Sequence, residues 1–178
     1  MYISSFELLV KPIAPKPFPS NVSRRVVQAY FLSISNLDSA EDVVLSLQFT
    51  GTPTVTTDNT FTIFDSGSSN MFGELAPDSV TGKPSQILTL AKGQTGLFVL
   101  QPDLSKPGIL DEANLEVRGY VELFISPLSP SDSAELLISP QIRGTFLPSD
   151  LTDPNPDFDQ QAYSLPTANG TALIKLER

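Results

Sequence analysis

The chain contains no His, no Cys and no Trp among its 178 residues. Without His or Cys it cannot build a Ser-His-Asp triad, a thiolate nucleophile, an imidazole- or thiolate-bound zinc site or a disulfide framework. No phosphate-binding loop, dinucleotide fingerprint or nucleophile elbow is present either. Two carboxylates could still act as acid and base, but nothing selects a pair from the 20 acidic residues. We therefore predict that the protein is not an enzyme and uses no cofactor.

Basic charge is also scarce, because 11 Lys and Arg face 20 Asp and Glu and the net charge is −9. Such a charge repels nucleic-acid phosphates and anionic lipid headgroups. The longest apolar runs reach only four residues, as in Leu97-Phe98-Val99-Leu100, whereas a membrane-spanning helix needs ~20. The start of the chain has no basic segment followed by an apolar one, as a secretory signal would. The sequence predicts a soluble, cytoplasmic protein with no nucleic-acid partner and no membrane insertion.

The residues that are present favour strands over helices. The charged fraction is 17% and Pro numbers 16, and alternating or continuous apolar segments recur between turn signals. We predict a single all-β domain over 1–178, an antiparallel β-sandwich of about eight to nine strands. The strands are expected near 2–10, 26–35, 43–50, 60–65, 86–91, 95–101, 115–126, 135–147 and 171–177.

Two connections are unusual. The Pro-rich connector 11–19 is expected to be extended polyproline II, either as a rigid link between strands or, through Pro12 and Pro15, as a ligand for an aromatic groove. The acidic loop 148–170 shows no regular pattern. We expect that loop to be ordered only if its apolar anchors pack on the sheet or on another subunit; these are Phe158, Tyr163 and Leu165.

Segment 26–101 resembles the strand-loop-strand order of immunoglobulin-like and fibronectin-type β-sandwiches. The resemblance rests on the run Phe31-Leu32-Ser33-Ile34-Ser35-Asn36, on 43–47, and on 88–95 leading into 97–100. It implies an immunoglobulin-like fold and no particular function. With the segment 115–147 added, the order is also similar to the cytoplasmic β-sandwiches of the sensory rhodopsin transducer family. That resemblance implies a soluble, partner-binding sandwich that can form oligomers.

Segments 115–126 and 135–147 are expected to pair as a hairpin in which opposed residue numbers sum to 261. That register places Arg118 opposite Arg143 on the face away from the core. Tyr120, Gln141, Glu116 and Glu122 share this face. Opposed like charges destabilise a sheet, so either the neighbouring carboxylates neutralise the arginines or the guanidinium groups bind an anion or a partner's carboxylates. Pro140 predicts that its strand lies at an edge or carries a bulge.

Oxygen-bearing side chains alternate in segment 150–159 and superficially resemble a calcium loop. Asp153, Asn155, Asp157 and Asp159 are the candidate ligands. The segment lacks the Gly and the bidentate Glu of the helical calcium-binding motif, because Phe158 and Ser164 occupy those positions. The alternatives are an irregular calcium site and a solvated acidic loop.

We therefore interpret the sequence as a non-enzymatic interaction or scaffold protein that acts through surface contacts and associates with itself. The alternative is a small-ligand-binding module, with calcium in segment 150–159 or an anion at Arg118 and Arg143.

Overall fold

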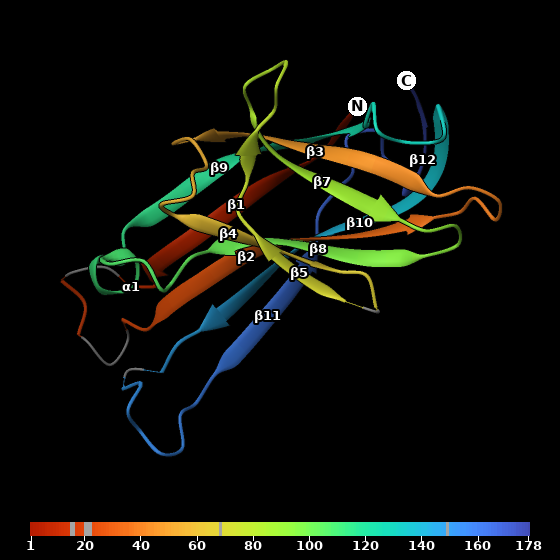
Figure 1. Ribbon diagram of the computed structural model, residues 1–178. Helices are drawn as coiled ribbons and strands as arrows, with labels where there is room; N and C mark the ends of the chain where they lie inside the picture. The colour runs from red at the N-terminus through yellow and green to blue at the C-terminus, as the bar shows by residue number, and fades with distance from the viewer. Residues whose placement is uncertain (15–16, 20–22, 68, 149) are drawn as a thin grey trace.

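The computed structural model describes residues 1–14, 17–19, 23–67, 69–148 and 150–178 (Figure 1). Twelve strands of these residues form one continuous antiparallel sheet. Within the same ranges the only helix is α1 (Ile109–Glu112), which has four residues. The all-β expectation is confirmed. No described helix is long and apolar enough to cross a membrane.

All nine strands expected from the sequence are present. They are β1 (Tyr2–Pro12), β2 (Arg25–Asn36), β3 (Val43–Thr52), β4 (Thr60–Asp65), β7 (Pro84–Leu90), β8 (Thr95–Pro102), β9 (Leu115–Ile125), β10 (Ser133–Phe146) and β12 (Leu173–Glu177). Each buries residues at alternate positions over much of its length, which is the pattern that made it recognisable.

The expected count of eight to nine strands is wrong, because the structure has three further short strands at sheet edges. They are β5 (Asn70–Gly73), β6 (Ala76–Pro77) and β11 (Asp159–Ser164). These strands bury no residue fully, so no alternation of apolar and polar side chains marks them. The expectation that 148–170 is irregular throughout is therefore wrong for the six residues of β11.

The sheet branches at β2. One edge of β2 pairs with β10 along almost its whole length. The other edge is shared, since residues 25–28 pair with β1 and residues 30–35 pair with β8. From this branch one wing continues through β1, β9, β3, β7 and β6, and the other through β8, β4 and β5.

The two wings curl toward each other and enclose the core. Phe49 of β3 stacks on Phe98 of β8 with ring centroids 5.7 Å apart, and Phe6 of β1 meets the Phe49 ring edge-on at 5.9 Å. Tyr30 of β2 is fully buried, and its hydroxyl shares a 3.0 Å hydrogen bond with the hydroxyl of Ser4. An immunoglobulin-like arrangement is not confirmed, because β1 and β2 join the wings into one curled sheet.

The expected hairpin between segments 115–126 and 135–147 is wrong. β9 pairs with β1 and β3, whereas β10 pairs with β2, β11 and β12. The apolar pattern correctly identified the core-facing side of each strand. A period of two fixes only that side, and it leaves open which strand lies alongside.

Pro140 is accommodated without placing β10 at an edge. Beyond β2, residues 133–137 of β10 pair with β12 and residues 141–146 pair with β11, so Pro140 falls between these two short strands. Its carbonyl accepts a hydrogen bond from the Leu165 amide. Proline has no amide proton to donate. Neither β11 nor β12 pairs with β10 at Pro140, so no ladder hydrogen bond is lost there.

The Pro-rich connector can be followed only in part. Lys11 and Pro12 belong to β1 rather than to an extended connector. The polyproline II prediction for 15–16, including Pro15 of the Pro-rich motif, lies outside the described residues.

Candidate functional site

The two arginines expected to face each other lie on opposite sides of the sheet. Arg118 pairs with Glu7, and Leu9 on the same side of β1 pairs with Gln28. Arg143 pairs with Ala29, whose side chain points away from that of its neighbour Gln28. Arg118 and Arg143 therefore lie in two separate environments.

Arg118 is neutralised within its own wing. Its Nε donates to Glu7 Oε1 at 2.6 Å, and its Nη1 forms an ion pair with Glu116. Lys11 also pairs with Glu116. For Arg118 the first alternative holds, in which neighbouring carboxylates quench the guanidinium charge.

Glu122 and Tyr120 extend this charged surface on β9. Lys83, in the connection from β6 to β7, forms an ion pair with Glu122 and lies 5.8 Å from the centre of the Tyr120 ring. The hydrogen bond to Glu122 raises the pKa of Lys83. Tyr2 packs edge-on against Tyr120 at 5.4 Å. We call Arg118, Glu116, Tyr120, Glu122 and Lys83 the β9 cluster. Sequence reasoning missed Lys83, because no local pattern links it to β9.

Arg143 has different surroundings. Its guanidinium lies 4.3 Å from the centre of the Phe31 ring, and Nε and Nη2 donate to Gln141 Oε1 at 3.3 and 3.2 Å. Among the described residues no carboxylate lies within ion-pair distance of Arg143. The positive charge is therefore held by an aromatic face and an amide, and it remains open to an external anion.

A groove of about 460 Å³ surrounds this arginine on the outer side of β2, β10 and β11. We call it the Arg143 groove. Its walls include apolar side chains from three parts of the fold together with the guanidinium: Val27, Ala29, Phe31, Leu104, Ala162 and Arg143. Ala29 and Phe31 reach the groove because side chains alternate along β2: Tyr30 and Leu32 enter the core, and Ala29 and Phe31 face outward.

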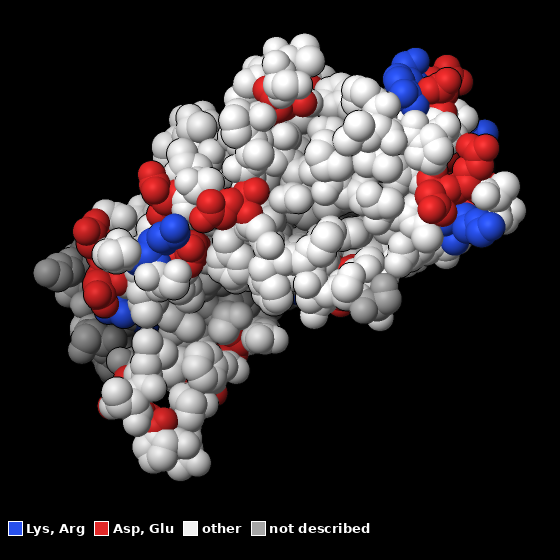
Figure 2. All heavy atoms as spheres, in the orientation of Figure 1, with Lys and Arg blue, Asp and Glu red and all other residues white. Residues whose placement is uncertain are grey.

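The view in Figure 2 shows how unevenly charge is spread over the surface. On that side the basic side chains lie at two ends of the molecule, and the area over β5 and β7 between them carries almost no charged side chain. Met71 and Phe72 of β5 are among the exposed apolar residues there. This area offers few charged groups to fix the orientation of a partner, whereas the Arg143 groove contains a guanidinium.

The calcium ligands expected in segment 150–159 are not gathered around a common point. Arg24 Nη1 donates to Asp159 Oδ2 at 2.5 Å, and Arg24 Nη2 donates to the Asp157 carbonyl at 2.9 Å. Asp153 Oδ1 accepts the Asn155 amide at 2.9 Å. Within the part of the chain that the structure describes, no group of three or more acidic side chains is arranged to hold a metal ion. The described side chains therefore do not support a calcium site in this segment.

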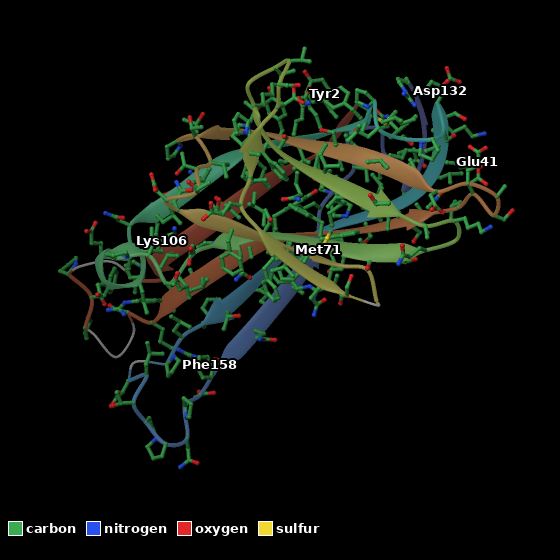
Figure 3. The ribbon with its side chains drawn as sticks, in the orientation of Figure 1. Tyr2, Glu41, Met71, Lys106, Asp132 and Phe158 are labelled. Carbon is green, nitrogen blue, oxygen red and sulfur yellow. The ribbon has the colours of Figure 1, made fainter. Side chains whose placement is uncertain are left out.

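The apolar anchors of segment 148–170 divide into two kinds. Leu165 packs against the core, and the Tyr163 hydroxyl donates to Gln28 Oε1 at 3.4 Å. Phe158 is 47% exposed in the loop before β11 (Figure 3). The end of the segment is therefore held by the sheet, whereas Phe158 presents its ring to solvent.

No family model matches this chain, and no curated protein matches its sequence. Among solved structures, the collagen-binding subdomain ACE19 of the Enterococcus faecalis surface protein ACE is 12% identical, with a TM-score of 0.25 over 92% of this chain and 97% of that one. Clostridium perfringens delta-toxin is 10% identical, with a TM-score of 0.24 over 99% of this chain and 79% of that one. Similarity at this level carries no argument about function.

Proposed function

We propose that the protein is a non-enzymatic, cytoplasmic binding domain whose Arg143 groove receives an acidic segment of a partner protein. The observation that carries the proposal is the state of Arg143, which is stacked on Phe31 in an apolar groove and paired with no described carboxylate. Arginine and aromatic side chains in desolvated pockets supply much of the energy at protein interfaces.

The chemistry of the groove defines the partner segment. A carboxylate can form two parallel hydrogen bonds with a guanidinium fork. The walls formed by Val27, Ala29 and Leu104 bury an apolar side chain next to that carboxylate. The expected ligand is therefore an Asp or Glu beside an aliphatic or aromatic residue.

A library of displayed random peptides selected on the immobilised full chain tests the proposal. We expect the enriched sequences to place an acidic residue next to an apolar one and to lose most of their affinity for the Arg143→Ser variant. Arg118→Ser is the matched control and should bind as the wild type does, because Arg118 lies on the other side of the sheet. Enriched peptides without acidic residues, or peptides that bind Arg143→Ser equally well, would overturn the proposal.

The proposal includes self-association, which is tested separately by sedimentation velocity of the wild-type chain over a range of concentrations. We expect the mass in solution to rise with concentration. A monomer at every concentration would contradict this part of the proposal and leave the peptide-binding part standing.

A further inference from the structure

The open strand edges of the described sheet differ in how well they are protected against pairing. β6 has two residues, one of them Pro77, and β5 has four. β12 carries Lys175 and Glu177, the kind of charged side chain that commonly blocks an edge. β11 is longer than any of these, with six residues that are all exposed.

β11 has none of the usual protective features. It contains no Lys, Arg, Pro or Gly, and its single charge, Asp159, is bound by Arg24. Exposed edges without such features are ready templates for another strand. Among the described residues β11 pairs with β10 alone, so its other edge has no strand partner.

The backbone groups available on this edge follow from the register with β10. The Leu165 amide donates to the Pro140 carbonyl, and hydrogen-bonded pairs alternate along an antiparallel ladder. Tyr163 and Gln161 therefore bond to β10, opposite Ile142 and Gly144. The amide and carbonyl groups of Gln160, Ala162 and Ser164 consequently point to the open edge.

We infer that two copies of this chain pair through β11 across a two-fold axis that passes at Ala162. The inference rests on the proposed self-association and names its surface. In this register Ala162 lies opposite Ala162 of the second copy, and Gln160 lies opposite Ser164 of the second copy. All three outward-facing residues of both strands are then hydrogen-bonded, which gives about six new backbone bonds.

The side chains of β11 fit a second copy of the same strand. Across the two-fold axis the register opposes Ala162 to itself, Gln160 to Ser164, and Gln161 to Tyr163. No charged side chains meet, although each copy carries a net charge of −9. Pairing of identical surfaces is what a two-fold dimer requires. Since Ala162 also lines the Arg143 groove, pairing brings the two grooves onto one extended surface.

The absence of cysteine makes the register directly testable. In the full chain, Ala162→Cys should yield a disulfide-linked dimer on mild oxidation, because residues in a hydrogen-bonded antiparallel pair lie about 5.5 Å apart between Cα atoms, within disulfide range. Gln160→Cys is the matched control on the same exposed strand. Its two copies would lie roughly 13 Å apart at 3.3 Å per residue, so it should not cross-link, yet mixing it with Ser164→Cys should yield the mixed dimer.

Two further variants test the contribution of the edge to assembly. Ala162→Pro removes an amide that bonds to nothing in β10, and Ala162→Lys places two like charges together at the axis. Each should weaken dimerisation by roughly tenfold or more in sedimentation experiments. Lys175→Pro removes an outward amide from β12 and should leave dimerisation unchanged.

The outcomes separate this inference from the function on which it rests. A wild-type monomer at all concentrations would overturn both the self-association and the β11 pairing. A wild-type dimer in which Ala162→Cys cross-links no better than Gln160→Cys would overturn the pairing alone. Selective cross-linking of Ala162→Cys, with weaker assembly of Ala162→Pro, would establish it.

Discussion

The outer surfaces of β9 and of β10 with β11 present the same kind of residue in opposite states. On β9, Arg118 binds two carboxylates of its own wing, and Lys83 covers Glu122. On β10, Arg143 rests on Phe31 beside a groove and a strand edge that is open among the described residues. The difference teaches that the neighbouring strand decides whether an outward arginine is already satisfied or available for binding.

The largest expected effect compares one glycine of β9 with one glycine of β10. In Gly119→Ala the new Cβ would lie 1.9 Å from the Thr50 carbonyl oxygen of β3, a clash that backbone movement alone can relieve. We expect the free energy of unfolding to fall by more than about 3 kcal/mol. Chemical denaturation measures the change.

Gly144→Ala in β10 is the matched control. Its Cβ would meet only Val26 Cγ2 at 3.5 Å, an ordinary contact. Its stability should stay within about 1 kcal/mol of the wild type, since alanine also restricts the unfolded chain. Equal losses for the two variants would show that β9 is packed no more tightly than β10.

A pH titration sharpens the comparison at β2, the strand that joins the two surfaces. Burial raises the pKa of Tyr30 above its ordinary value of 10.0, although the hydrogen bond with Ser4 opposes the shift. Above pH 10 the unfolded chain loses this proton and the folded chain keeps it. Stability should therefore decrease by up to about 1.4 kcal/mol per pH unit from this group.

Tyr30→Phe isolates that contribution. The variant has no phenol to ionise at this position, so its free energy of unfolding should fall less steeply above pH 10 than that of the wild type. Lys83 also lowers the stability of both proteins at high pH, because its pKa is raised in the folded chain and its ion pair with Glu122 is lost when it deprotonates. This contribution is the same in both proteins. Identical slopes for the two proteins would contradict the assignment to Tyr30.

A smaller effect is expected for Arg118→Ser. The substitution leaves Glu7 and Glu116 without their shared cation, and Arg118 is largely exposed. We expect a loss of at most about 1 kcal/mol, which added salt should reduce. Thermal unfolding at low and high salt measures it, and a gain in stability would contradict the ion-pair network.

The smallest effect on stability is expected for Arg143→Ser. No described ion pair is broken, and Arg143 is exposed where it stacks on the half-buried Phe31, so the unfolding free energy should change by less than about 1 kcal/mol. The loss should appear in binding of acidic peptides instead. A large loss of stability would show that Arg143 serves the fold rather than a partner.

Salt dependence distinguishes the two kinds of contact. Binding of an acidic peptide to Arg143 should weaken as salt is added, because attraction between unlike charges is screened. Pairing of two β11 strands should strengthen, because salt screens the repulsion between two acidic copies. Isothermal titration and sedimentation at several salt concentrations measure the two trends.

The apolar pattern predicted where most strands lie but not which strands pair with one another. It located the nine strands and the core-facing side of β9 and β10, because alternate burial follows from the geometry of a single strand. It failed for β11, whose residues are all exposed. It also failed for the hairpin, because pairing depends on residues as distant as Glu7 and Arg118.

The sequence by itself determined that the protein is all-β, acidic and without thiol or imidazole chemistry, because these properties follow from composition and local periodicity. Only the tertiary structure decided that Arg118 is quenched and Arg143 is not. It did so by branching the sheet at β2, which sends β9 and β10 to different neighbours. Charge neutralisation acts over a few ångströms, and at that range the fold, rather than the order of residues along the chain, determines which groups meet.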